Sequence, residues 1–576
     1  MQKTFTRPLT FAEYTELRLR IRWCLSFVLL SLAWPCGAQI QTTVNVDLST
    51  PEGEFTPIYS WFGYDESNYT TTQNGQALLR ELHDLSPVPI NIRAHFLLAT
   101  GDGKPELKWS STNVYTEDAH GNPVYSWTIL DQIFDAYAAA KVRPMVELGF
   151  MPKALSSHPD PYHIPWPTKP GDAEGWSFPP KDYQRWGELV RQVAAHLAQR
   201  YGRDTVATWY WEVWNEPDIS YWHGTEEEYN KLYDYAAAGL KAAIPNARVG
   251  GPATTGPVPD GHSSQFLEAF LEHCAKDQSA ATGGMIPLDF ISFHVKGSPN
   301  IVGDHVQMGL NRELSSAATG FEIVQKFPQY KNLPIILSEA DPEGCAACSS
   351  RIYPHNAYRN STLYPAYTAA ALKGLFELRD RYQVNLISML TWAFEFEDQP
   401  YFDSFRTLST NGIDKPVINF FRMAGLMSGH RVRVESSGSV QLDDILKTGV
   451  RQKPDVDALA TAADREASVM LWNYHDDDLP GPPAEIQLVI KGFQSAEHRV
   501  LIEHYRIDET HSNAYTVWKQ IGSPQNPTPA QYAQLRAAGG LQLETSPQWI
   551  DLASGAIKRN ISLPRQGISL LRLSWE

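Results

Sequence analysis

The sequence predicts an α/β fold in which a (β/α)8 TIM barrel is followed by a C-terminal β-sandwich domain. From about residue 54, apolar strand-like runs alternate with amphipathic helix-like runs, and eight strand candidates can be counted. This alternation is typical of a parallel barrel surrounded by helices. After about Gly429 the pattern changes to short strand-like runs separated by turn clusters, which favours a sandwich. We therefore expect a barrel over residues 39–428 and a sandwich over 429–576.

Most of the eight barrel strands are continuously apolar, as expected for strands that are covered on both faces. They span residues 57–63, 88–97, 143–150, 209–215, 248–253, 288–294, 335–339 and 386–394. Helical stretches lie between them, for example at 78–85, 130–140, 183–201, 226–243 and 364–379. The alternative is a doubly wound open sheet, which would be expected to have a glycine-rich phosphate loop after the first strand, and none is present.

The strand-like runs of the second domain are rich in Val, Ile, Leu and Tyr. They span residues 431–435, 468–474, 485–490, 500–506 and 568–573. Turn clusters separate them, including three consecutive aspartates at 476–478 and a Pro-Gly-Pro-Pro run at 480–483.

Length and composition limit the function classes. A chain of 576 residues is too long for one compact core, so at least two domains are expected. The net charge of −16 argues against nucleic acid as a partner, because phosphate binding needs clustered Lys and Arg. The 17 Trp and 26 Tyr residues suggest carbohydrate, whose C–H faces stack on aromatic rings, although aromatic residues also fill cores.

The N-terminus has the pattern of an export signal, which we expect to occupy residues 1–38. Arg18, Arg20 and Arg22 precede a short apolar run, and the small residues Gly37 and Ala38 follow it. The run is too short to span a bilayer comfortably, although an uncleaved anchor is the alternative. We therefore expect a secreted or periplasmic protein with no membrane contact after cleavage.

Three cysteines lie outside the expected signal. Cys345 and Cys348 have a C-x-x-C spacing, which in an exported protein favours a local disulfide. A metal site at this pair would need further ligands that the sequence does not identify. Cys274 is expected to be a single buried thiol.

The strongest chemical signal is the run 209–218, in which an aromatic strand ends in Asn215 and Glu216 and is broken by Pro217. In a (β/α)8 barrel the C-terminal ends of the strands form the catalytic mouth. Aromatic neighbours disfavour an ionised carboxyl group and help to keep it protonated, as a general acid requires. Asn215 is able to donate a hydrogen bond to a substrate hydroxyl. The alternative is a structural carboxylate at a strand end.

A second buried strand, at 335–339, also ends in a glutamate. Glu339 would close the seventh strand and face the same mouth as Glu216, which would close the fourth. Two carboxyl groups about 5 Å apart suit a retaining glycosidase, whereas an inverting one needs a wider gap. Asp341 is an alternative nucleophile that lies further into the loop. No metal or cofactor is required for this chemistry.

Together these segments resemble glycoside hydrolase family 39, a clan A family that contains β-xylosidases and α-L-iduronidases. Trp-Asn-Glu-Pro at the end of the fourth strand and a glutamate at the end of the seventh are similar to clan A in general. Further similarity to family 39 lies in the segments 87–89, 93–95, 147–152, 505–508, 512–515 and 522–524. The resemblance extends from about residue 55 to the C-terminus.

The resemblance implies roles for individual residues. Glu216 matches the acid/base and Glu339 the nucleophile. The expected substrate-binding residues are Asn215, His95, Phe150, His294, Trp392, Glu395 and Glu397. Of the last two, we expect only one to contact substrate.

One departure from the family concerns Lys296, two positions after His294, where xylosidases of the family often carry an aromatic residue. It introduces a cation that would favour an acidic sugar.

The resemblance favours a retaining exo-acting β-D-xylosidase that acts on xylo-oligosaccharides and needs no cofactor. Two alternatives remain open. One is another family 39 exo-glycosidase, with an arabinosyl or uronyl substrate. The other is a barrel that binds carbohydrate without catalysis. The oligomeric state is not readable from the sequence.

Overall fold

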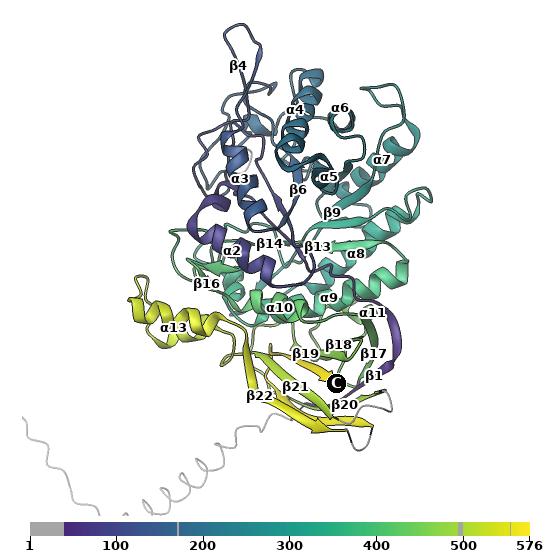
Figure 1. Cartoon of the computed structure of the whole chain (residues 1–576), viewed down its shortest axis with the longest axis vertical. Coiled ribbons are helices and arrows are strands. Elements are labelled where there is room, and N and C mark those ends of the chain that lie inside the picture. Colours follow the sequence, from purple (N-terminus) through teal and green to yellow (C-terminus); the bar gives the residue numbers. More distant parts are fainter. Residues whose placement is uncertain (1–39, 170–171, 494–498, 553–554, 576) are drawn as a thin grey trace, which may run out of the picture.

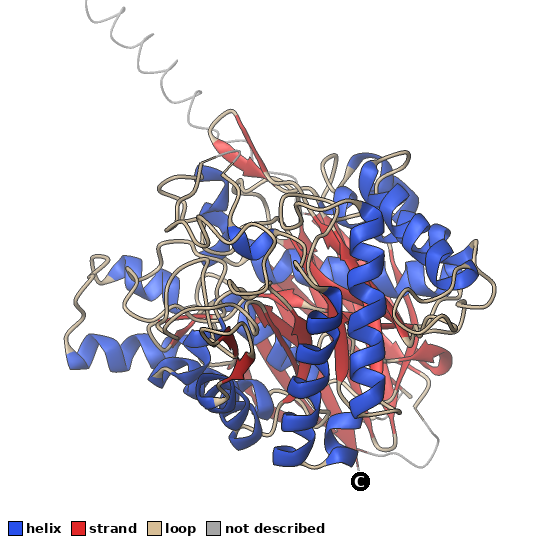
Figure 2. Ribbon diagram, turned by 90° about the horizontal axis from the view of Figure 1, so that it is seen from above, coloured by secondary structure: helices blue, strands red, loops and turns tan. Residues whose placement is uncertain are grey.

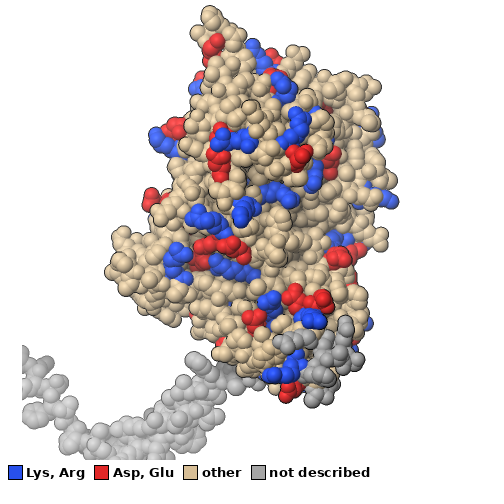
Figure 3. All heavy atoms as spheres, viewed as in Figure 1, with Lys and Arg blue, Asp and Glu red and all other residues tan. Residues whose placement is uncertain are grey.

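The computed structural model describes residues 40–169, 172–493, 499–552 and 555–575, arranged as a barrel above a curled β-sheet (Figure 1). The expected signal at 1–38 lies outside these residues. No helix of the described chain combines the length and the hydropathy needed to cross a membrane. Basic and acidic side chains are intermixed over the face shown in Figure 3.

The barrel is a closed ring of parallel strands. Each predicted strand is present, and the eighth is interrupted into two pieces, one pairing with the seventh strand and the other with the first. The ring runs through β2 (Trp61–Tyr64), β3 (Asn91–Ala94), β6 (Arg143–Leu148), β7 (Tyr210–Val213), β8 (Arg248–Thr254), β9 (Phe290–Lys296), β12 (Ile335–Asp341), β13 (Leu386–Met389) and β14 (Thr391–Trp392).

Helices cover the outside of this ring (Figure 2). They are α2 (Gln73–Asp84), α3 (Thr128–Ala139), α4 (Tyr183–Tyr201), α5 (Arg203–Ala207), α6 (Glu226–Ala243), α7 (His262–Lys276), α8 (Leu310–Gln325), α9 (Leu363–Tyr382) and α10 (Pro416–Gly425). Side-chain caps fix some of their starts: Asp182 accepts from two amides of α4, and Thr225 and Glu228 form a capping box on α6.

Short elements occupy the loops of the barrel. They comprise the hairpins β4 (Tyr115–Glu117) with β5 (Pro123–Tyr125), β10 (Asn300–Val302) with β11 (His305–Gln307) and β15 (Ser409–Thr410) with β16 (Ile413–Asp414), and the 3-10 turns η1 (Ser67–Thr71), η2 (Gly175–Ser177) and η3 (Pro354–Asn360).

The second domain is a nine-stranded mixed sheet. Its strand order is β22 (Gln542–Asp551), β21 (Arg499–Ile507), β24 (Ile568–Trp575), β19 (Glu466–Tyr474), β18 (Asp455–Ala463), β17 (His430–Ser436), β1 (Ile40–Glu54), β20 (Ala484–Lys491) and β23 (Ala556–Leu563). The sheet curls, so that Ile502 of β21 and Ile561 of β23, from opposite halves of the strand order, share one apolar core. Helices α11 (Leu442–Thr448), α12 (Ala514–Gln520) and α13 (Pro529–Gly539) lie beside it.

The structure differs from the expected domain limits at the N-terminal side. Residues 40–54 were expected to begin the barrel, but β1 lies inside the second sheet, where it pairs in parallel with β20 and antiparallel with β17. The reason is visible in its burial pattern, because alternate residues Val44, Val46 and Leu48 enter the core of that sheet. Strand β17 begins at His430, close to residue 429, where the second domain was expected to start.

Candidate active site

The C-terminal ends of the barrel strands surround a cavity of about 460 Å³. Its lining includes the two predicted catalytic residues, Glu216 from the turn after β7 and Glu339 from β12. The predicted residues Asn215, His95 and Trp392 line it as well. His294 is fully buried and contacts both glutamates. Strands that are far apart in the sequence therefore bring these side chains into one place.

Glu216 reaches the cavity through a turn with unusual backbone angles. After β7 ends at Val213, Trp214 and Glu216 both adopt positive φ values, of 72° and 43°. The Glu216 amide donates to the Ala253 carbonyl at 2.8 Å, and the Trp214 indole donates to the Tyr221 carbonyl at 3.0 Å. Backbone in this region is unfavourable for residues other than glycine and clusters at functional sites.

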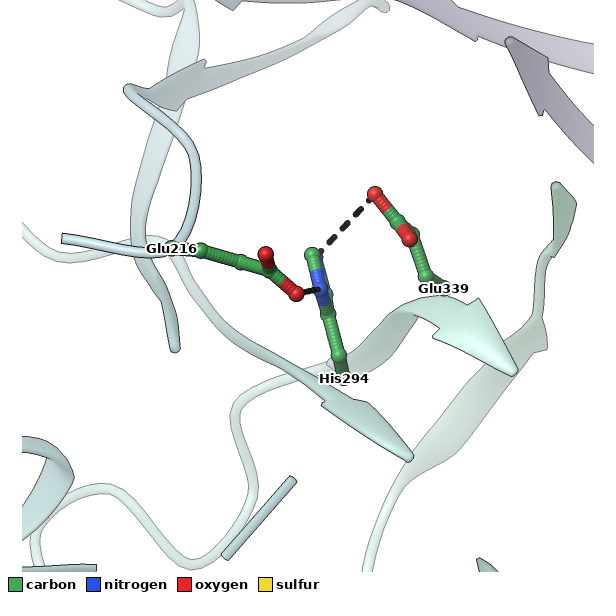
Figure 4. A group of neighbouring side chains, drawn as sticks. All are labelled: Glu216, His294 and Glu339. Atoms are coloured by element: carbon green, nitrogen blue, oxygen red, sulfur yellow. Dashed lines mark hydrogen bonds and ion pairs between the residues drawn. The ribbon is translucent and has the colours of Figure 1, made fainter. Parts of the chain in front are cut away.

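His294 lies between the two glutamates (Figure 4). Its Nδ1 is 2.8 Å from Glu216 Oε1, and its Nε2 is 3.8 Å from Glu339 Oε1. One side-chain atom from each of these three residues lies within 4.8 Å of the other two. An oxygen of Glu216 therefore lies within 4.8 Å of an oxygen of Glu339.

Glu339 is surrounded by positive charge. Lys296 Nζ lies 2.7 Å from Glu339 Oε2, and Arg93 Nη1 lies 3.2 Å from Oε1. Burial by itself would raise the pKa of Glu339, but the charges of His294, Lys296 and Arg93 outweigh burial and hold this pKa well below its usual value. Glu339 is therefore ionised in the resting site, which is the state that a nucleophile needs.

The positive charges around Glu339 also disfavour the binding of a metal ion. Glu216, His294 and Glu339 are close enough to act together as ligands. Lys296 and Arg93, however, already occupy both oxygens of Glu339. A divalent cation would have to displace or face these charges, so the donor set does not fit a metal ion.

Arg93 is a fully buried arginine that organises the base of the site. Its guanidinium contacts Glu212 at 2.5 Å, Glu147 at 2.8 Å, Asn215 Oδ1 at 2.9 Å and Glu339 at 3.2 Å. Burial opposes its charge, but the surrounding carboxylates raise the pKa of Arg93 above its normal value. The contact with Asn215 Oδ1 leaves the amide nitrogen of that residue to donate into the cavity.

Carboxyl groups lie beside both ring nitrogens of His95. Its Nδ1 is 2.5 Å from Glu147, and its Nε2 is 3.3 Å from Asp65. Burial first, and the charge of Arg93 second, lower the pKa of His95 well below its usual value, so the ring is neutral. Trp392 packs against it at 4.3 Å and donates its indole N–H to Asp65.

Phe150 does not line the cavity. It is completely buried and packs against His95 and Tyr221, with ring centroids 5.5 and 5.6 Å apart. It supports the wall from behind, because two residues that do line the cavity rest on it.

Neither Glu395 nor Glu397 lines the cavity, although one of them was expected to contact substrate. Glu395 is fully buried, where it accepts hydrogen bonds from the Ser409 hydroxyl and the Asn411 amide. Burial raises the pKa of Glu395 to about 7. Glu397 accepts from the Asn74 amide at 3.4 Å. After Trp392 the chain turns away from the mouth, and the strand-end pattern does not reveal this turn.

Several residues of the site were missed by the sequence analysis. Asp65 follows β2 directly and was detectable as a carboxylate at a strand end. Arg93 was detectable as a charge inside an apolar strand. Lys108 and Tyr221 also line the cavity, but they come from loops that carry no comparable signal. Lys108 binds Asp65 at 2.6 Å.

The loop after β12 forms the wall beside the nucleophile. Cys345 and Cys348 form a disulfide, as expected, and Cys345 lines the cavity. The fully buried Arg359 donates to the carbonyl groups of both cysteines at 2.8 Å and to Glu343 at 2.5 Å. Cys274 is free and buried, also as expected.

Known proteins show similarity over most of the chain. The β-xylosidase of Geobacillus stearothermophilus is 28% identical over 495 residues, covering 84% of this chain and 86% of that protein. The mouse α-L-iduronidase is 27% identical over 383 residues, covering 61% of this chain and 56% of that protein. The crystal structure of a monomeric β-xylosidase from Caulobacter crescentus has the same fold, with a TM-score of 0.72 at 21% identity, covering 92% of this chain and 99% of that one.

The family model "Glycosyl hydrolases family 39" matches residues 107–553. This range includes both catalytic candidates and most of the second domain. The protein is therefore a glycoside hydrolase that belongs to family 39.

Proposed function

We propose that the protein is a retaining exo-glycosidase that removes β-D-xylosyl units from xylo-oligosaccharides. The observation that carries this proposal is the pair Glu216 and Glu339, which face one cavity with carboxylate oxygens within 4.8 Å of each other. Carboxyl groups this near to each other favour a retaining enzyme, in which they lie roughly 5–5.5 Å apart, over an inverting one, which needs roughly 6.5–9.5 Å to hold a water between them. The similarity to β-xylosidases over most of the chain supports the choice of sugar.

The mechanism follows from the positions of the two glutamates and from the positive charge around Glu339. Glu339 attacks the anomeric carbon while Glu216 transfers its proton to the glycosidic oxygen, so that the leaving alcohol departs and a glycosyl ester forms on Glu339. Glu216, now ionised, takes a proton from water, and this water releases the sugar from Glu339. His294 contacts both carboxylates, and Arg93 and Lys296 hold Glu339 for attack.

A second candidate is an acidic sugar. Lys296 Nζ lies in the cavity, 2.7 Å from both Glu339 and Asp341. When Glu339 becomes esterified it loses its charge, and Lys296 then has one ion pair fewer. A sugar carboxylate would replace this interaction. The similarity to α-L-iduronidases is consistent with this candidate.

The test is a panel of nitrophenyl glycosides with xylosyl, arabinosyl and uronyl groups, with the product anomer followed by NMR. We expect fastest cleavage of the β-xyloside and a β-anomer as first product. Preference for a uronide would replace the xylosyl proposal with the acidic one. An inverted first product would contradict the double displacement, and binding of sugars without cleavage of any glycoside would contradict the enzyme.

We also propose that the protein is exported, to the cell exterior or the periplasm, after removal of residues 1–38. The charged and apolar pattern of that segment supports this. N-terminal sequencing of the protein from its native source should begin at Gln39, and a chain that begins at Met1 would contradict the proposal.

A further inference from the structure

A second cavity, of about 430 Å³, adjoins the catalytic one. The two cavities meet at Lys108, Trp166 and Tyr221, which line both. We call the second cavity the side chamber. Most of its other lining residues come from the segments that follow β3, β6 and β7, and they include Phe96, His163, Trp176, Ser220 and His223, while Tyr353 comes from the segment after β12.

Trp176 lines the side chamber and carries a buried hydrogen-bond donor without an acceptor among the described residues. The residue is only 8% exposed, and its indole nitrogen has no partner within the described parts of the chain. Its ring is fixed by Phe96, Phe150 and Tyr221, with centroids 4.7 to 5.5 Å away. A buried donor without an acceptor is unfavourable, and a ligand hydroxyl in the side chamber would supply the acceptor.

The charged residues that line the side chamber are balanced in number, with Lys108 and Lys169 against Asp172 and Glu174. Lys108 binds Asp65 at 2.6 Å. Glu174 accepts from the Ile164 amide at 2.6 Å and lies 3.2 Å from the ring of His163. Aromatic faces combined with a few polar groups suit a neutral sugar, whose C–H faces stack and whose hydroxyls accept and donate hydrogen bonds.

The position of the side chamber indicates which part of the substrate enters it. The bond to be cleaved lies between Glu339 and Glu216, and the leaving group departs past Glu216. On the side of β8 and β9 the catalytic cavity continues along Thr255, Ser298 and Arg312. The side chamber opens on the other flank, past Lys108, where the loops after β3, β6 and β7 and Tyr353 line it.

We propose that the side chamber binds a neutral sugar unit joined to the non-reducing side of the sugar that Glu339 attacks. The protein would then release a disaccharide in one step as well as single sugars. The chemistry is unchanged: the disaccharide is transferred to Glu339, the leaving alcohol takes the proton of Glu216, and water releases the disaccharide. This inference rests on the proposed function and extends it beyond a single terminal sugar.

The experiment compares two nitrophenyl substrates, built from whichever sugar the enzyme cleaves fastest. One carries the single sugar and the other carries its β-1,4-linked disaccharide, which is xylobiose if that sugar is xylose. The first product is identified by mass spectrometry after rapid quenching. We expect free disaccharide to appear together with nitrophenol. A first product consisting of the single sugar and a nitrophenyl monosaccharide would overturn the inference.

Two variants test the side chamber itself. Ser220→Trp fills it at a residue that does not line the catalytic cavity, and Trp176→Phe removes the unused N–H while keeping a ring. We expect kcat/KM for the disaccharide substrate to fall about tenfold or more for Ser220→Trp and several-fold for Trp176→Phe. The value for the single-sugar substrate should stay within about twofold. Ser546→Trp, an exposed position of β22, is the matched control.

Equal losses on both substrates would overturn the inference while leaving the proposed function intact. Failure of the wild-type protein to cleave any single-sugar glycoside would instead reject the proposed function, and the inference would fall with it.

Discussion

At the scale of single residues, the site places two neighbouring glutamates in different surroundings. Glu339 is kept ionised by Lys296, Arg93 and His294. Glu216 instead contacts one histidine nitrogen and is partly open to the cavity, where a leaving group can meet it. The two environments differ in the number of cations, and this difference separates the roles of nucleophile and acid/base.

Replacing Glu216 with glutamine tests its role as the proton donor. Because a poor leaving group needs protonation and an activated aryl group does not, Glu216→Gln should slow cleavage of alkyl glycosides about 10²- to 10⁴-fold. With dinitrophenyl glycosides, the same variant should form the glycosyl-enzyme at a rate much closer to that of the wild type. Steady-state and burst kinetics on both substrates check this. Glu227→Gln, exposed on α6, is the control and should be unaffected. Equal loss on both substrates would speak against the assignment.

Lys296 gives a second residue-scale prediction. Lys296→Met removes a cation that lowers the pKa of Glu339, so this pKa should rise. Because Glu339 must be ionised to attack, the acidic limb of the kcat/KM profile should move to higher pH. Arg312→Met removes a charge from the same cavity without a described contact to Glu339 and serves as the control. An unchanged acidic limb in Lys296→Met would contradict the electrostatic account of the nucleophile.

At the scale of elements, each strand of the barrel was predictable because a strand covered on both faces is continuously apolar. Glu216 and Glu339 were predictable for the same reason, since a carboxylate at the end of such a strand is conspicuous. The positive φ values at Trp214 and Glu216, the contacts of Arg93 and the turn after Trp392 depend on tertiary packing. Sequence patterns do not carry this information, and Glu395 and Glu397 were placed in the mouth for that reason.

The buried loop after β14 gives a prediction for stability. The pKa of Glu395 is raised to about 7 by burial, whereas an exposed glutamate titrates near 4.5. The folded protein therefore binds this proton more tightly, and its stability falls as pH rises from about 4.5 to 7. Glu395→Gln removes this loss, which amounts to about 3 kcal/mol of unfolding free energy above pH 7.

Urea unfolding of wild type and Glu395→Gln at pH 4.5 and pH 8 measures the effect of Glu395. The unfolding free energy of the variant, relative to that of the wild type, should be higher at pH 8 than at pH 4.5. The partially exposed Glu397 provides the comparison, and Glu397→Gln should show a much smaller shift. If the unfolding free energies of Glu395→Gln and wild type changed equally between the two pH values, Glu395 would be ruled out as the source of the pH dependence.

At the scale of the whole molecule, the two domains are connected more closely than the sequence suggests. Strand β1 precedes the barrel in the chain but lies in the second sheet, between β17 and β20 (Figure 1). Helix α13 reaches back to the barrel, where Tyr532 donates to the Asn411 carbonyl at 3.0 Å. The sequence analysis identified no strand at residues 40–54 and assigned them to the barrel by sequence order alone, and sequence order does not show which strands a segment pairs with.

Truncation tests the position of β1. A chain that begins at residue 39 should fold and keep activity. A chain that begins at residue 55 lacks β1, so β17 and β20 lose their shared partner and the second core loses Val44, Val46 and Leu48. We expect this shorter chain to be insoluble or to unfold many degrees lower in calorimetry. Equal unfolding temperatures for the two chains would show that β1 is dispensable.

The central claim is that Glu339 forms a covalent bond to the sugar while Glu216 handles the proton. A 2-deoxy-2-fluoro glycosyl fluoride of the preferred sugar slows the second step and traps the intermediate. Mass spectrometry of the treated protein should show one added fluorosugar, and peptide mapping should place it on Glu339. A label on Asp341 or another residue, or turnover without any label and with an inverted product, would contradict the account.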